Sequence, residues 1–303
     1  MMNQAVIALG MSVLLIGFAS AEQEPSGADI KATAVRLLKA SNAERLEQLQ
    51  LILRERSLEF ETQTVPHPTP KHDKRTEGHN LLLNVGATRD GPTILVGAHS
   101  DAATLEDGRL SGGMVDNASS VAVLVHLAAA LKANPPRHAV RFVFFDMEEE
   151  GLVGSHFFTQ SPLKDGVTAM INLDTLYGGN TLIYGPAAGV EHEQVNAAMR
   201  VVCVTADFSC VEFEHFPPSD DASFRKAGVP NISLAVLPGA EAHQLWLMIS
   251  GGKQPGLEKG FLPGVLRTIH TPADQPDKLD PKALTIAYRA TAELLRHLDQ
   301  DQR

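Results

Sequence analysis

The chain has 303 residues, 44% of them hydrophobic, and a formal net charge of −10 at pH 7. Acidic residues are spread along the chain, which makes nucleic acid and anionic membrane surfaces poor partners. This length is about that of two average domains. Helix and strand patterns nevertheless continue without a linker, so we expect one domain over residues 22–303, with a sizeable core.

The first 21 residues carry no charged side chain, and they end in Ala19-Ser20-Ala21 after a short apolar stretch. This pattern predicts a secretory signal peptide that is cleaved after Ala21. We therefore expect a periplasmic or secreted protein that does not contact a membrane once the leader is removed. The absence of lysine and arginine at the start leaves an uncleaved membrane anchor as the alternative.

The next part of the chain alternates between two periodicities. Residues 28–56 show the apolar spacing of one or two amphipathic helices. Alternating or continuous runs rich in β-branched residues then predict strands at 58–65, 79–85 and 93–99. Residues 116–132 are apolar on nearly all sides after Asn117 and Ser119, which are good helix-starting residues, so we expect a helix buried against a sheet.

The same alternation continues to the end of the chain. Further strands are predicted at 141–147, 169–175, 181–186 and 231–237, and further helices at 155–160, 191–202, 221–228 and 281–298. A strand, helix, strand succession implies parallel pairing by crossover. The fold class is therefore α/β, with a mixed, mostly parallel central sheet between helical layers.

Two segments do not fit that pattern. Residues 238–266 contain many glycines and the single tryptophan, Trp246, and are interpreted as a lid or insertion loop because the segment is long for a plain connection. Cys203 and Cys210 are the only cysteines, and an even, closely spaced pair in an exported protein favours a local disulfide. Two free buried thiols are the alternative.

Metal-binding side chains follow the predicted strands at several places. They lie in the segments GAHSD, GGMVDNASS, DMEEEGLVGS, INLDT and IHTPAD, and are His99, Asp116, Glu149, Asp174 and His270. Because the carboxyl ends of strands in an open α/β sheet meet at one edge, we expect these side chains to converge. Two nitrogen and three oxygen ligands suit zinc, and one carboxylate can bridge two ions.

The segments resemble the M28 family of co-catalytic zinc peptidases, with matching motifs from about His99 to Asp274. The resemblance implies two Zn2+ ions per chain, one held by His99 and Asp174, the other by Glu149 and His270, with Asp116 bridging. It also implies that Glu148 is the general base. A non-proline cis peptide between Asp116 and Asn117 is expected on the same ground.

The physical chemistry of the motif agrees with this division. Adjacent side chains at a strand end diverge, so Glu149 can hold an ion while Glu148 reaches a water molecule. Zinc lowers the pKa of water bound to it, and Glu148 can take a proton and pass it to a leaving amine. Asp101 lies two residues after His99 and is the expected acceptor that fixes the imidazole tautomer.

We expect a metallo-aminopeptidase acting on peptides with a free N-terminus, and we favour a monomer. Candidate substrate-binding residues are Asp220, Asp221, Phe224, Trp246 and Tyr177. The family often has Ser-Asp-His before an aromatic residue, whereas this chain has Ser219-Asp220-Asp221. The additional acidic group predicts a preference for a basic first residue.

Three other functions are compatible with parts of this pattern. A glutaminyl cyclase, which closes an N-terminal glutamine with one zinc, is the main alternative. A binding module that kept the fold but lost catalysis predicts missing ligands, and every expected ligand is present. Dipeptidase or carboxypeptidase action on the same scaffold usually comes with an inserted dimerisation domain, and no such insertion separates Asp116 from Glu149.

Overall fold

The computed structural model describes residues 24–67, 75–86, 92–250 and 262–301. The predicted signal peptide, residues 1–21, lies outside this part of the chain. Eight strands form one sheet in the order β1-β2-β4-β3-β5-β8-β6-β7. Their bounds are Glu61–Pro66 (β1), Glu77–Val85 (β2), Thr93–His99 (β3), Ala139–Phe145 (β4), Val167–Leu176 (β5), Thr181–Gly185 (β6), Ser209–Glu212 (β7) and Asn231–Leu237 (β8).

The centre of the sheet is parallel. Strands β4, β3, β5 and β8 run in the same direction, while β1, β2 and β6 join by antiparallel pairing. The edge strand β7 pairs parallel with β6. The mixed, mostly parallel sheet expected from the sequence is confirmed.

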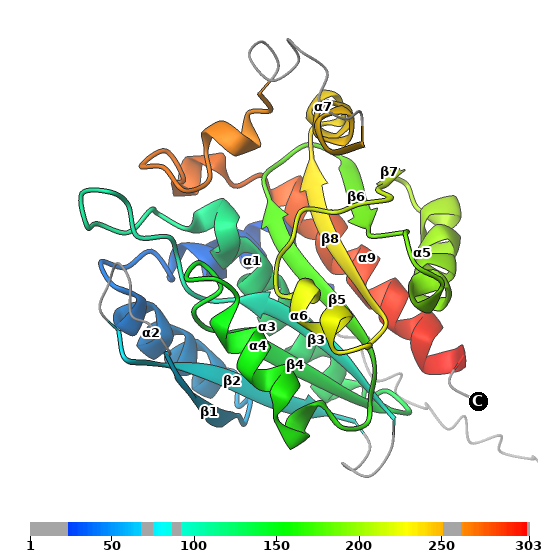
Figure 1. Ribbon diagram of the computed structural model, residues 1–303, viewed down its shortest axis with the longest axis horizontal. Coiled ribbons are helices and arrows are strands. Elements are labelled where there is room, and N and C mark those ends of the chain that lie inside the picture. The colour runs from blue at the N-terminus through cyan, green and yellow to red at the C-terminus, as the bar shows by residue number, and fades with distance from the viewer. Residues whose placement is uncertain (1–23, 68–74, 87–91, 251–261, 302–303) are drawn as a thin grey trace, which may run out of the picture.

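Helices cover both faces of this sheet. They are Gly27–Val35 (α1), Asn42–Glu55 (α2), Ser119–Ala133 (α3), Val153–Gln160 (α4), Glu193–Thr205 (α5), Asp221–Lys226 (α6), Gly239–Ser250 (α7) and Pro281–Asp301 (α9). Helices α4 and α6 pack on one face, and α3 and α9 on the other, where α1 contacts both (Figure 1). Ser26 and Ser41 begin α1 and α2 by accepting hydrogen bonds from backbone N–H groups of the first turn.

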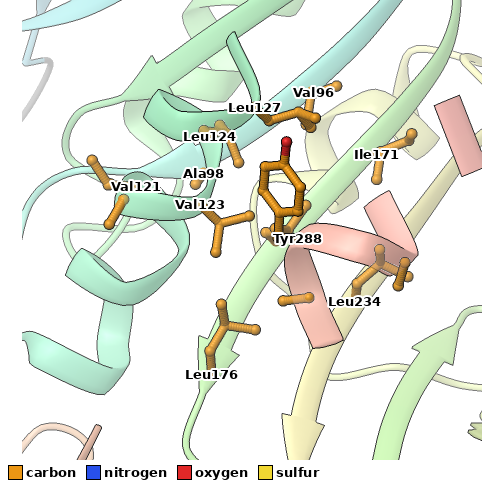
Figure 2. Close-up of a cluster of buried hydrophobic side chains, with 14 of the residues drawn as sticks. Val96, Ala98, Val121, Val123, Leu124, Leu127, Ile171, Leu176, Leu234 and Tyr288 are labelled. Atoms are coloured by element: carbon orange, nitrogen blue, oxygen red, sulfur yellow. The ribbon is translucent and has the colours of Figure 1, made fainter. Parts of the chain in front are cut away.

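Each face of the sheet has its own hydrophobic core. Along β3, Ile94, Val96 and Ala98 join the larger core, whereas Leu95 joins a smaller core under α4 and α6, as the two-residue period of a strand requires. Figure 2 shows the larger core, with the Tyr288 ring of α9 pointing between α3 and the strands. These two layers hold the strand ends in fixed positions.

Helix α3 is the most apolar of the described α-helices. Together with the kinked turn that precedes it, Met114–Ala133 is long and apolar enough to cross a bilayer, but 83% of its most apolar window is buried inside the protein. A helix with these properties is typical of the core of a globular domain. The prediction of a sheet-covering helix over 116–132 is confirmed.

Two elements depart from the sequence prediction. The first half of the segment 238–266, expected as loop, is helix α7, which packs near β6 and β7. Strand β7 was not predicted, because four residues at a sheet edge give too short a pattern. A disulfide joins Cys203 of α5 to Cys210 of β7, in agreement with the favoured interpretation of the cysteines.

Candidate active site

The parallel strands bring the predicted metal-binding residues to one edge of the sheet. His99 is the last residue of β3 and is paired in register with Phe145, the last residue of β4. Glu149 follows four residues after Phe145, and Asp174 lies near the end of β5. The sheet register therefore places side chains from distant parts of the sequence beside one another.

The converging side chains form two groups that share one residue. Ligand atoms of His99, Asp116 and Asp174 lie within 4.8 Å of one another, and so do those of Asp116, Glu149 and His270. These are the two sets expected for two metal ions. Asp116, in the kinked turn Met114–Ala118, belongs to both sets.

Asp116 directs its two carboxylate oxygens towards different histidines. Its Oδ1 is 2.9 Å from Nε2 of His99, and its Oδ2 is 3.1 Å from Nε2 of His270. His270 Nε2 is also 3.0 Å from Oε2 of Glu149, and His99 Nε2 is 3.7 Å from Oδ1 of Asp174. The peptide bond between Asp116 and Asn117 is cis.

The charges of this cluster fit divalent cations. Burial, together with the charge of Asp116, raises the pKa of Glu149 to about 7. Oε1 of Glu149 is buried without a hydrogen-bond partner among the described residues. Mutually repelling, partly unpaired buried carboxylates beside two imidazoles form a donor set that suits zinc.

Glu148 lies beside the cluster without belonging to either shared set. One of its oxygens is within 4.8 Å of the ligand atoms of His99 and Glu149. Burial raises the pKa of Glu148 well above its usual value, His99 opposes this shift, and Asp220 adds to it. Glu148 therefore presents a buried carboxyl beside the metal-binding groups, the kind of group that general acid–base catalysis uses.

Asp101 connects the ends of β3 and β4. Its two oxygens accept hydrogen bonds from the backbone N–H groups of Glu148 and Glu149, each at 3.2 Å. Its Oδ1 lies 3.5 Å from Nδ1 of His99, on the side of the ring opposite Asp116. Asp101 thus faces the imidazole as expected, but its hydrogen bonds hold the Glu148 and Glu149 backbone.

Asp274 is a site residue that was not singled out in the sequence. It is fully buried, and it accepts hydrogen bonds from the backbone N–H groups of Val115 (2.7 Å) and Asp116 (3.2 Å). A Cβ at Gly112 would lie 1.8 Å from the carbonyl oxygen of Asp274, so only glycine permits this approach. The position of Asp274 four residues after His270, in the same motif, was the available signal.

Two cavities border the cluster. A cavity of about 610 Å³ is lined by polar residues that include Asp101, Glu106, Glu149 and His270. A smaller cavity of about 80 Å³ adjoins Asp174 and is mostly apolar, with Ile183, Phe216, Ala235, Leu237, Leu245, Val265, Leu266 and Ile269 in its walls. The cluster is therefore reached from a wide polar side and from a narrow apolar side.

The structure corrects three expected substrate contacts. Phe224 is fully buried and packs its ring 5.9 Å from Phe145, in the core under α4 and α6. Asp221 is also buried and is paired with Arg225 at 2.8 Å, one turn along the same short helix. Asp220 is also fully buried, so it offers no exposed surface to a substrate.

The remaining two candidates lie near the apolar cavity but not in its described walls. Leu245 of α7 lines the cavity, whereas its neighbour Trp246 is 38% exposed. Tyr177 is half-buried, and its backbone N–H donates a hydrogen bond to the carbonyl oxygen of Val236. Leu245 lines the cavity in place of Trp246 because both residues lie in helix α7, and neighbouring residues of a helix point in directions about 100° apart.

Comparison with known proteins identifies the family. The sequence model of peptidase family M28 matches residues 80–295. The chain belongs to peptidase family M28. A probable lipoprotein aminopeptidase, LpqL, of Mycobacterium tuberculosis is 27% identical over 69% of this chain and 43% of its own length.

Solved structures in this family share the fold. A zinc aminopeptidase from Bacillus subtilis superposes with a TM-score of 0.67 at 13% identity, covering 91% of this chain and 96% of its own. A glutaminyl cyclase from Porphyromonas gingivalis gives 0.67 at 17% identity, covering 91% and 98%. The chain spans less than half the length of the curated M28 relatives that it matches, between 12% and 43%.

Proposed function

We propose that this M28 protein is a di-zinc aminopeptidase that removes N-terminal residues from peptides. The observation that carries the proposal is the pair of metal-binding groups that share Asp116, with Glu148 beside them. One ion would be held by His99, Asp116 and Asp174, and the other by Asp116, Glu149 and His270. Bound zinc would polarise the scissile carbonyl and lower the pKa of water.

The protein's own groups supply the remaining chemistry. Glu148 takes a proton from the attacking water and returns it to the leaving amine. Asp101 keeps the Glu148 and Glu149 backbone in place by accepting both N–H groups. The half-buried carboxylate of Asp174 is available to a positively charged α-amine at the mouth of the site.

A free α-amine is expected to be required for turnover. We expect the zinc-loaded protein to release p-nitroaniline from Leu-p-nitroanilide and to leave N-acetyl-Leu-p-nitroanilide intact, because acetylation removes the positive charge that the Asp174 carboxylate attracts. Initial rates on both substrates measure the difference. Equal turnover of the two would contradict an aminopeptidase.

The structure changes the expected substrate preference. Asp221, on which the preference for a basic residue depended, is buried and neutralised by Arg225. The cavity beside Asp174 is apolar. An apolar side chain gains free energy there, whereas a charged one loses hydration without gaining a partner. We therefore propose that peptides with apolar N-terminal residues are the substrates.

This preference is tested by Leu- and Arg-p-nitroanilide. The kcat/KM of the wild-type protein should favour the leucine substrate by about 10-fold or more. In Leu266→Glu the ratio should move towards the arginine substrate, because Leu266 lines the cavity. Val190→Glu is a matched control at a position that is 93% exposed. Equal use of both substrates by wild-type protein would refute the apolar preference.

Glutaminyl cyclisation is the second candidate, because a glutaminyl cyclase shares the fold over nearly its whole length. The complete second set of ligands favours hydrolysis. Metal analysis together with product analysis separates the two functions. Two zinc ions per chain with release of a free amino acid supports the aminopeptidase, and one zinc with formation of pyroglutamate supports the cyclase.

We also propose export to the periplasm or the medium. The disulfide between Cys203 and Cys210 supports this location, since disulfides persist in oxidising compartments. Mass spectrometry of the mature protein from its native host should find Glu22 at the N-terminus. A cytoplasmic protein with both cysteines reduced would contradict export.

A further inference from the structure

Arg45 is a buried arginine in helix α2 that the proposed chemistry does not use. Its side chain belongs to a helix whose other charged residues are half-buried or exposed, yet Arg45 is only 1% exposed. Burying a guanidinium group is costly unless its N–H groups are satisfied. Its partners therefore indicate what the buried charge does.

Within the described part of the chain, Arg45 donates its hydrogen bonds to backbone carbonyl oxygens. Nε donates to Ser100 (3.1 Å), Nη1 donates to Leu37 (3.0 Å) and Gly112 (3.3 Å), and Nη2 donates to Gly113 (3.2 Å). Among the described residues, no carboxylate lies within ion-pair distance of Arg45. The planar guanidinium group therefore binds three separate stretches of backbone at the same time: Leu37, Ser100 and Gly112-Gly113.

Three of the four carbonyl groups that Arg45 binds belong to the two ends of the connection 100–113, which joins His99 to the turn that carries Asp116, and the fourth is that of Leu37, which follows α1. Ser100 stands between His99 and Asp101, and Gly113 is three residues before Asp116. A Cβ at Gly113 would lie 3.1 Å from Nη1 of Arg45 and 2.6 Å from Cβ of Ala102. The backbone at Gly113 is therefore in close contact with both Arg45 and Ala102.

Asn42, one turn earlier on the same helix, reinforces this contact. Its Oδ1 accepts a hydrogen bond from the N–H of Ala102 (2.9 Å), and its Nδ2 donates to the carbonyl oxygen of Ala102 (3.1 Å). Helix α2 therefore fixes the loop after β3 through two side chains. Arg45 binds both ends of the connection 100–113, which a backbone hydrogen bond from the N–H of Ser111 to the carbonyl oxygen of Ala103 (2.8 Å) also holds together.

The charge of Arg45 also lies beneath the acidic cluster. Burial lowers the pKa of the guanidinium, while Asp101 and Asp274 act in the opposite direction. Because Arg45 has no carboxylate partner of its own, its charge offsets part of the repulsion among the site carboxylates.

We propose that Arg45 is a positioning residue that fixes the spacing between His99 and Asp116, and with it the affinity of the site for zinc. The proposal rests on the proposed di-zinc site. Residues that orient metal ligands typically change metal affinity or activity about 10- to 100-fold when they are replaced. Arg45 would act in this way through the backbone.

The test compares zinc binding by wild-type protein, Arg45→Met and Arg45→Lys, measured by competition with a chromogenic chelator, with folding checked by circular dichroism and urea unfolding. Arg45→Met should bind zinc about 10- to 100-fold more weakly. Arg45→Lys keeps the charge but loses the fork, so it should also bind more weakly than wild type. Arg56→Met is the matched control, because Arg56 ends the same helix and donates to Thr33, away from the site.

The outcomes separate this proposal from the proposed function. Wild-type protein that binds no zinc overturns both. Wild-type protein that binds two zinc ions, with wild-type affinity in folded Arg45→Met or Arg45→Lys, overturns the role of Arg45 alone. If Arg45→Met does not fold, Arg45→Lys decides. If Arg56→Met lost as much zinc affinity as Arg45→Met, the loss would be a general effect of changing helix α2. That result would also overturn the proposed role of Arg45.

Discussion

Replacing Glu148 by glutamine is expected to lower kcat by about 10²- to 10⁴-fold while KM changes little. Glutamine keeps the size of the side chain and its place beside His99 and Glu149. It cannot take a proton from water, so the barrier to bond cleavage rises while substrate binding is retained. Steady-state kinetics on Leu-p-nitroanilide with zinc-loaded protein measure both constants.

The matched control for this substitution is Glu150→Gln. Glu150 is close in sequence, but its carboxylate pairs with Arg75 at 2.7 Å and with His67 at 2.8 Å, away from the metal-binding sets. Its replacement should weaken this ion-pair cluster and leave kcat within a few-fold of wild type. Unchanged turnover in Glu148→Gln, with two zinc ions bound, would remove Glu148 as the base.

Replacing Asp116 by alanine is expected to abolish the paired metal site. Both groups of metal-binding side chains include Asp116, and its two oxygens face His99 and His270 separately. We expect zinc content well below two ions per chain, and a fall in kcat/KM of about 10³-fold, which corresponds to about 4 kcal/mol. Elemental analysis after dialysis gives the zinc content.

Asp165→Ala serves as the control for Asp116→Ala, because Asp165 carries a 75% exposed side chain in a loop. It should keep both ions and full activity. If Asp116→Ala retained two tightly bound zinc ions, Asp116 would not be the shared ligand, and the proposed arrangement of the site would be wrong.

Much of the fold can be predicted from local hydrophobic patterns in the sequence. The central strands β3, β4, β5 and β8 are short, largely apolar runs, which is the pattern expected of parallel strands that are buried on both faces. Helix α7 was not predicted, because the glycines and prolines around it resemble a loop, although GAEAHQLWLMIS is a good helical sequence once it packs near β6 and β7.

The site was predictable where a motif fixes both chemistry and position. His99, Asp116, Glu149, Asp174 and His270 all converge as expected. The pocket around them was not predictable, because neighbouring residues on a helix face different ways. Arg45 was missed for a related reason: a charged residue in an amphipathic helix is expected to face solvent, and its burial depends on carbonyl groups from distant loops.

The two cavities beside the metal-binding cluster differ greatly in size. The apolar cavity beside Asp174 has about 80 Å³, and the cavity beside His270 has about 610 Å³. On the aminopeptidase function proposed above, the small cavity would take the first side chain of a peptide and the large one the chain that follows. Cleavage would then be confined to the end of the peptide, and a substrate without a free end would be expected to stay intact.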